Sequence, residues 1–246
     1  MRSPLLELHG VGLVYPVFTV KQQSIRHVLF SAVTGGKMLK DSGNTVHVQA
    51  LDNVNIKLFE GDRLGLIGHN GSGKTTLLKV IAGIYEPTAG HVLASGEISS
   101  MIDIACGMDL EATGVENIKL VGRIRGFSER KIKDQIEEII AFADLGPFID
   151  LPIKTYSAGM QMRLLFAIGT CFVPEILILD EWLGAGDAGF VSKAESRMES
   201  FVQDSKLLII ASHNHDLIKR RCNKLCVMSS GKVEFFGPTE EYFASN

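Results

Sequence analysis

The sequence predicts an α/β fold with a mainly parallel sheet and a helical insertion. Three short segments, 64–67, 176–179 and 207–211, are apolar throughout and have the length of buried strands. Residues 188–203 carry apolar side chains at helical spacing, so strand, helix and strand alternate along the second half of the chain. The stretch from about 110 to 165 is helical by the same criterion, which makes it an insertion in the α/β core.

The remaining elements follow from turn and cap signals. Segments 5–13 and 46–58 have strand patterns and turn signals at Gly10 and at 60–62. In the insertion, Ser128 can cap a helix that Gly146-Pro147 would stop, and a last strand is expected at 232–236. With 246 residues, 46% of them apolar, the chain can fill the core of one large domain, 1–246, with a helical subdomain at about 105–170.

Residues 68–75, GHNGSGKT, have the spacing of a phosphate-binding loop. The strand at 64–67 enters the loop, and the helix at 75–82 leaves it and ends at Gly83. Glycines let successive N–H groups point inward at the positive end of that helix, which suits the triphosphate of a nucleotide. Lys74 would reach the β- and γ-phosphates, and the Thr75 hydroxyl would help to hold Mg²⁺. A glycine-rich turn before a buried helix is the structural alternative.

Two acids and a histidine emerge where apolar strands end. Asp180 is placed to hold the Mg²⁺ shell through water, and Glu181 to orient and deprotonate an attacking water. His213 follows the strand at 207–211, where an imidazole can bond the γ-phosphate or position water. The alternatives are a solvated acidic turn for the acids and an ordinary surface residue for His213, as we expect for the other histidines.

A second anion site is suggested by residues 156–163, YSAGMQMR, which precede an apolar helical stretch at 164–172. A hydroxyl and small residues then lie at a helix N-terminus. A plain N-cap explains this pattern equally well.

Composition excludes several classes of function. A net charge of −3 gives no global basic field, so nucleic acid is not expected as a partner. No apolar run reaches the ~20 residues of a membrane span, and the start resembles no signal peptide, so we expect a cytosolic protein. The four cysteines fit no metal pattern and are interpreted as reduced thiols.

Together these motifs resemble the ordered motifs of ABC-type ATPase subunits: the phosphate loop at 68–75, the signature at 156–163, LILDE at 177–181, GAGD at 184–187 and SH at 212–213. The resemblance implies a P-loop NTPase core with a mainly parallel sheet, an antiparallel β-subdomain and the helical insertion. It also implies that two copies sandwich ATP head to tail, and that Asp187 communicates across that interface. Lys74, Glu181 and His213 would be catalytic. The implied ATP contacts are Tyr15 on adenine, Gly68, His69, Asn70, Gly71, Ser72, Gly73, Lys74, Thr75 and Thr76, with Ser157, Ala158 and Gly159 contributed by the other subunit.

Some residues differ from the general motifs of the family and indicate one of its subfamilies. Ala158 and Met160 alter the signature, and Trp182 stands where proline is common. These motif sequences are similar to those of ATPases that export lipid-linked polysaccharides such as O-antigen, capsule or teichoic acid. This implies a homodimer bound to two transmembrane permease subunits at the cytoplasmic face of the bacterial inner membrane, with the lipid-linked polysaccharide passing through the permease. The glutamine that such ATPases carry after the core strands is absent, and Asp103 or a carbonyl near Ile104 is a candidate to replace it at Mg²⁺.

The extra segment at about 16–48 supports the same comparison. Ser24 can cap a short amphipathic helix there, and Lys21, Arg26, Lys37 and Lys40 give a local positive balance. One hypothesis puts this segment near the membrane or the permease. A surface helix without such a role is equally compatible with the residues.

Three rival functions share part of the pattern. The ATPase of an importer or of a drug or lipid exporter has the same motifs and differs only in its partner. A soluble ABC-type protein acting on DNA or ribosomes usually has tandem cassettes or coiled-coil insertions, which these 246 residues lack. A small-molecule kinase with a phosphate loop has no need of the motifs at 156–163 and 212–213.

Overall fold

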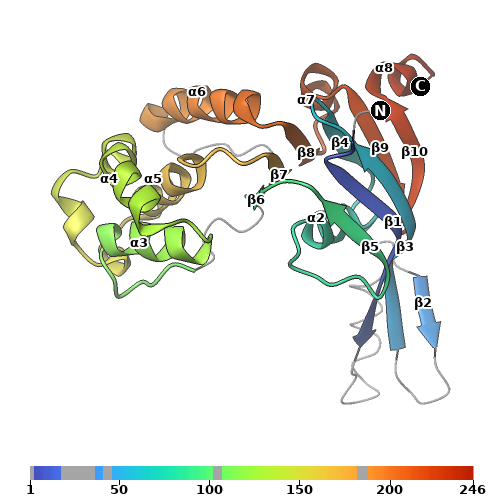
Figure 1. Ribbon diagram of the computed structural model, residues 1–246, viewed down its shortest axis with the longest axis horizontal. Helices are drawn as coiled ribbons and strands as arrows, with labels where there is room; N and C mark the ends of the chain where they lie inside the picture. Colours follow the sequence, from blue (N-terminus) through green and yellow to red (C-terminus); the bar gives the residue numbers. More distant parts are fainter. Residues whose placement is uncertain (1–2, 18–36, 41–45, 102–106, 182–187, 246) are drawn as a thin grey trace. The chain divides into compact units, whose positions relative to one another are not determined.

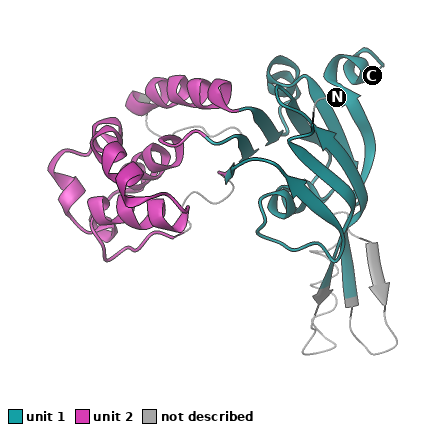
Figure 2. Ribbon diagram, viewed as in Figure 1, with its two compact units in different colours: residues 1–99, 174–182, 206–246 teal, residues 100–173, 183–205 magenta. Residues whose placement is uncertain are grey.

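A computed structural model describes residues 3–17, 37–40, 46–101, 107–181 and 188–245. The chain forms two compact units (Figure 2). Unit 1 comprises Met1–Ser99, Pro174–Trp182 and Lys206–Asn246, and unit 2 comprises Ser100–Val173 and Leu183–Ser205. Within the ranges described, no helix has the length and apolar character needed to cross a bilayer.

The first sheet of unit 1 has four antiparallel strands in the order β2-β3-β1-β5 (Figure 1). They are β1 (Leu6–Val17), β2 (Lys37–Lys40), β3 (Val46–Leu58) and β5 (Ala89–Ala94). Leu6 and Leu8 of β1 are buried while Glu7 and His9, which alternate with them, are not, and this is the pattern of a sheet covered on one face. The predicted strands at 5–13 and 46–58 are therefore confirmed.

The second sheet of unit 1 has six strands in the order β10-β9-β4-β8-β7-β6. Its strands β9, β4, β8 and β7 are parallel, and β10 is antiparallel to β9. Every residue from Ile176 to Leu179 and from Leu207 to Ala211 is buried, as expected for parallel strands covered on both faces. The predicted parallel core is correct. The bounds are β4 (Arg63–Ile67), β6 (Ile98–Ser100), β7 (Ile176–Asp180), β8 (Leu207–Ala211), β9 (Lys224–Ser229) and β10 (Lys232–Pro238).

Three helices belong to the described part of unit 1. Helix α2 (Lys74–Ile81) leaves the loop after β4, as the sequence predicted, and is followed by Gly83 at φ 72°. Helix α7 (His215–Arg221) packs on β4, and α8 (Thr239–Ser245) packs on β9 and β10. Phe243 of α8 lies against the ring of His215 and under the ammonium of Lys219, and it thereby joins α8 to α7.

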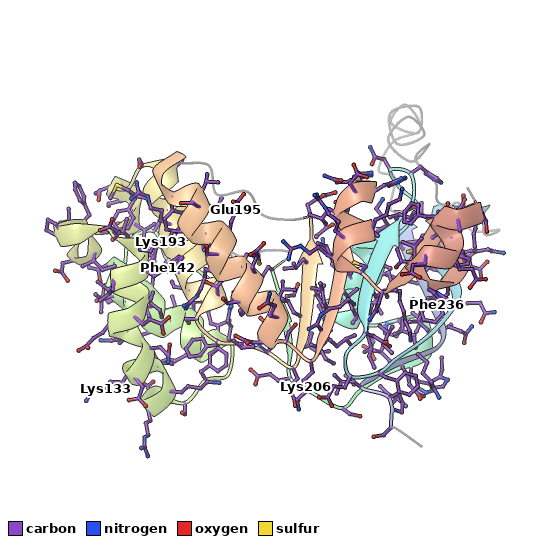
Figure 3. All side chains as sticks on the ribbon, turned by 90° about the horizontal axis from the view of Figure 1, so that it is seen from above. Lys133, Phe142, Lys193, Glu195, Lys206 and Phe236 are labelled. Atoms are coloured by element: carbon purple, nitrogen blue, oxygen red, sulfur yellow. The ribbon has the colours of Figure 1, made fainter. Side chains whose placement is uncertain are left out.

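Unit 2 is built from α3 (Gly114–Ile124), α4 (Glu129–Ala143), α5 (Ala158–Thr170) and α6 (Ala188–Asp204), with the 3₁₀ turns η2 (Gly146–Asp150) and η3 (Ile153–Thr155). Ser128 caps α4 by accepting a bond from the Lys131 N–H, as predicted. Lys193 of α6 donates to the carbonyl of Phe142 in α4 and lies over its ring, and both side chains are labelled in Figure 3.

One predicted boundary was wrong. Helix α4 ends at Ala143, before Gly146-Pro147, because Asp144 adopts a left-handed conformation with φ 50° and closes the helix with its own N–H on the Ile140 carbonyl. Gly146 and Pro147 begin η2 instead. The helix expected after Ser24 lies outside the described residues.

Candidate nucleotide-binding site

The loop between β4 and α2 is shaped by glycines in conformations that other residues rarely adopt. Gly68, Gly71 and Gly73 have φ values of 150°, 76° and 105°. A Cβ on Gly68 would lie 2.2 Å from the Met228 carbonyl oxygen, so no side chain fits there. The loop therefore curls tightly against β9, with its helix N-terminus directly behind it.

Lys74 is held inside this loop. Its side chain is buried, and its Nζ donates to the carbonyl oxygens of Gly68 at 2.8 Å and His69 at 3.2 Å. Burial lowers the pKa of the Lys74 ammonium, and the charges of Asp180 and Glu181 oppose that shift. A cation surrounded by the loop backbone, with two carboxylates within electrostatic range, is suited to a phosphate group.

A buried serine hydroxyl in the same loop also indicates a phosphate site. The Ser72 side chain is fully buried, and its Oγ has no hydrogen-bond partner in the described part of the chain. A buried hydroxyl normally has a hydrogen-bond partner, so this one is available to donate to a phosphate oxygen. Thr75, the residue predicted to face Mg²⁺, is exposed, and Thr76 is half-buried.

Tyr15 of β1 lies beside helix α2. Its hydroxyl bonds the Thr76 side chain, and its ring meets the edge of Tyr85 with centroids 5.7 Å apart. Burial raises the pKa of Tyr15. β1 thus brings the residue predicted to contact adenine next to α2, while the contact itself stays a prediction.

The two predicted acids follow β7. Asp180 is its last residue and is half-buried, while Glu181 is exposed and has a left-handed φ of 72°. The Glu181 N–H donates to the Ala211 carbonyl at 2.9 Å. Its Oε2 accepts from Ser212 Oγ at 2.9 Å, and its Oε1 accepts from the His213 N–H at 3.2 Å. The fold therefore joins Glu181 to the residues just after β8.

The signature residues belong to unit 2. Ser157 is the N-cap of α5, and its Oγ accepts from the Met160 N–H at 3.2 Å. The preceding Tyr156 is buried and donates its hydroxyl to the Phe148 carbonyl at 2.7 Å, and burial raises the pKa of Tyr156. Ala158 is exposed and Gly159 is half-buried, so the helix tip presents small residues.

Two features of the site were not predicted. The turn before β10 supports the phosphate loop, because the Gly231 N–H donates to the Ser72 carbonyl at 2.9 Å and the Gly231 carbonyl accepts from the Asp52 N–H at 2.9 Å. Ser230-Gly231 signals a turn in the sequence, but nothing local to it reveals these partners. The other feature is the bond from Ser212 to Glu181. Asp103, Ile104, Trp182 and Asp187 lie outside the described residues.

Residues 51–184, more than half of the chain, match the family model of the ABC transporter. This chain belongs to the ABC transporter family. The predicted family resemblance is thereby confirmed, and the matched region begins in β3 and includes the phosphate loop, the signature and both acids.

Similar family members carry names from polysaccharide export. The chain is 43% identical over 224 residues to an O-antigen export system ATP-binding protein of Yersinia enterocolitica, covering 91% of this chain and 94% of that protein. It is 39% identical over 239 residues to a teichoic acids export ATP-binding protein of Staphylococcus haemolyticus, covering 97% of this chain and 86% of that protein.

Solved structures of ABC proteins share the fold. An ATP-binding subunit of an ABC transporter superposes with a TM-score of 0.70 at 19% identity, covering 98% of this chain and 92% of that one. A dimeric ATP-binding cassette in a post-hydrolysis state, bound to ADP and Pi, gives 0.66 at 20% identity, covering 95% and 98%. The predicted ABC-type ATPase fold is therefore confirmed.

Proposed function

We propose that this protein is the ATP-hydrolysing subunit of an ABC exporter that moves a lipid-linked polysaccharide across the cytoplasmic membrane. The names of the relatives from Yersinia and Staphylococcus support the choice of cargo class. A homodimer would work at the cytoplasmic face of the membrane with two permease subunits.

One observation carries the proposal. Unit 1 holds a buried Lys74 in the phosphate loop within electrostatic range of Glu181, whose carboxylate is bonded to Ser212 and to the His213 N–H. Lys74 and the loop amides would bind the phosphates, and Glu181 would orient and deprotonate the attacking water. His213, whose side chain is exposed, would contact the γ-phosphate. Phosphoryl transfer needs such positioning and charge neutralisation rather than a covalent intermediate.

The residues present also fit a magnesium ion beside the phosphates. Thr75 and Asp180 would hold it, Thr75 through its hydroxyl and Asp180 through water. When bound, Mg²⁺ supplies charge neutralisation of the phosphate oxygens. Asp103 is proposed as a further group facing it.

Turnover would require two copies of the chain. Ser157, Ala158 and Gly159 at the α5 tip of one copy would contact the ATP held by Lys74 of the other, and Asp187 would communicate across the interface. The N-cap geometry of Ser157 supports this role, since amides at a helix N-terminus attract phosphate. ATP binding would close the dimer, and hydrolysis would reopen it and move the permease.

A Glu181→Gln variant tests the catalytic assignment. Turnover should fall about 10²–10⁴-fold because the amide cannot accept the water's proton, while ATP binding persists. Light scattering should then find the variant dimeric with magnesium and ATP. Glu175→Gln is the matched control, since Glu175 directly precedes β7 and pairs with Lys206 away from the site. Normal turnover in Glu181→Gln would remove Glu181 from its role, and a monomer saturated with ATP would remove the dimer.

The cargo needs a separate experiment. The protein would be purified with its permease in lipid nanodiscs, and ATPase activity would be measured with lipid-linked glycans of different classes, with drugs and with simple lipids. Stimulation by a lipid-linked polysaccharide supports the proposal. Stimulation only by drugs or simple lipids would instead favour a different exporter.

A further inference from the structure

The Ser212 side chain links the proposed base to the rest of the fold. It is 2% exposed, and its Oγ donates to Glu181 Oε2 at 2.9 Å. The same oxygen accepts from the Asn214 N–H at 3.1 Å. A serine hydroxyl has a single proton, so with Asn214 acting as donor that proton is directed at the Glu181 carboxylate.

Glu181 is held at three points by residues around the end of β8. Its N–H bonds the Ala211 carbonyl, and its two carboxylate oxygens accept from Ser212 Oγ and the His213 N–H. The residue also has the left-handed φ of 72°, a conformation that persists in a non-glycine residue only where surrounding contacts maintain it. Each carboxylate oxygen has about two lone pairs and accepts one of these bonds, which leaves capacity for a water molecule on both.

Ser212 is itself fixed from two sides. Its N–H donates to the carbonyl of Leu66 at 3.2 Å, in the strand that leads into the phosphate loop. Asn214, which donates to Ser212 Oγ, is the N-cap of α7 and accepts from the Leu217 N–H at 3.0 Å. β4 and α7 together therefore determine where the Ser212 hydroxyl lies. Its bond to Glu181 in turn restrains the carboxylate, which is otherwise exposed.

We propose that Ser212 is a positioning residue for ATP hydrolysis, which fixes the Glu181 carboxylate through its hydroxyl so that a free lone pair faces the attacking water. This rests on the proposed role of Glu181 as general base. Without the hydroxyl, the longer 3.2 Å bond from the His213 N–H is the one that would still hold the carboxylate among the described residues, and the side chain would sample orientations that do not face the water.

The alternative is a purely structural serine that satisfies a buried amide. Such a residue would affect stability or nucleotide binding, whereas a positioning residue lowers kcat and leaves ATP affinity unchanged. The two roles therefore separate in a comparison of KM with kcat.

The test uses Ser212→Ala, Ser212→Cys and Ser212→Thr. Alanine and the weakly donating cysteine should lower kcat about tenfold or more, with KM and the affinity for a fluorescent ATP analogue within about twofold of wild type. Threonine, which keeps a hydroxyl, should restore most of the rate. Ser205→Ala is the matched control, because Ser205 is also buried and donates to the Val202 carbonyl. Crystal structures of the nucleotide-free alanine and cysteine variants should show the Glu181 carboxylate displaced.

Several outcomes overturn the inference: unchanged kcat in a folded alanine or cysteine variant, a parallel loss of ATP affinity, no rescue by threonine, or an unmoved carboxylate. Glu181→Gln is measured alongside. If that variant is inactive while Ser212→Ala is fully active, only the role of Ser212 fails. If Glu181→Gln itself turns over normally, the proposed general base fails instead.

Discussion

Gly231→Ala probes the support of the phosphate loop from the turn before β10. Gly231 has φ 79°, and a Cβ added there would lie 2.6 Å from the Ala50 carbonyl oxygen and 3.2 Å from Leu51 Cα. Both obstacles are backbone, so the turn must move rather than a side chain. Its N–H bonds the Ser72 carbonyl, and this movement reaches the phosphate loop directly.

The expected magnitude follows from two costs. A left-handed alanine costs about 1–2 kcal/mol, and forcing a methyl group into a filled space costs about 1–3 kcal/mol more. The free energy of unfolding should therefore fall by about 2–5 kcal/mol. Weakening the bond to Ser72 should cost about 0.5–1.5 kcal/mol of ATP binding, roughly a twofold to tenfold higher dissociation constant.

The matched control is Gly83→Ala. Gly83 has φ 72° and lies in the same unit, but an added Cβ meets nothing within 4 Å, so this variant carries only the conformational cost of about 1–2 kcal/mol. Urea unfolding would measure the stability of both variants, and fluorescence titration would measure ATP binding. Equal destabilisation of the two variants, or unchanged ATP affinity in Gly231→Ala, would show that the turn does not support the loop.

Two other predictions concern the signature helix and the thiols. Ser157→Ala and Ser128→Ala each remove a helix N-cap and should each cost about 1 kcal/mol in urea unfolding, but only Ser157→Ala should abolish ATPase activity; equal activities would reduce Ser157 to a plain cap. Burial raises the pKa of the Cys226 thiol from 9.0 to about 12. The folded state therefore keeps a proton that the unfolded chain releases, so this contribution to stability is complete below pH 9 and is lost as the pH rises toward 12. The urea midpoint should fall less between pH 9 and 11 in Cys226→Ala than in wild type, and equal slopes would contradict the shift.

The sequence predicted the parts of the site that lie close together along the chain. The phosphate loop, its strand and its helix occupy consecutive residues, and their chemistry is encoded by glycine, lysine and threonine at fixed spacing. Apolar runs located β7 and β8, so the positions of Asp180, Glu181 and His213 at strand ends follow from the order of residues alone. Ser157 as an N-cap followed from local preference in the same way.

Contacts between distant segments could not be predicted. The bond from Ser212 to Glu181 joins residues 31 positions apart, and the contact of Gly231 with Ser72 depends on the packing of the turn before β10 against the loop. The end of α4 was misplaced for another reason: Asp144 is one of the few non-glycine residues that adopt a left-handed conformation, and the stronger signal at Gly146-Pro147 obscured it.

Strand register explains why these distant groups meet at all. Ala211 of β8 is the partner of Leu66 in β4 and of Asp180 in β7, so the three strands end level with one another. The phosphate loop starts directly after β4, Glu181 directly follows β7, and Ser212 directly follows β8. Because side chains alternate along a strand, a slip of β8 by one residue would turn the Ser212 hydroxyl away from Glu181. The pairing of β8 with β4 and β7 therefore fixes the geometry of the proposed base, although none of the side chains of β8 takes part in the chemistry.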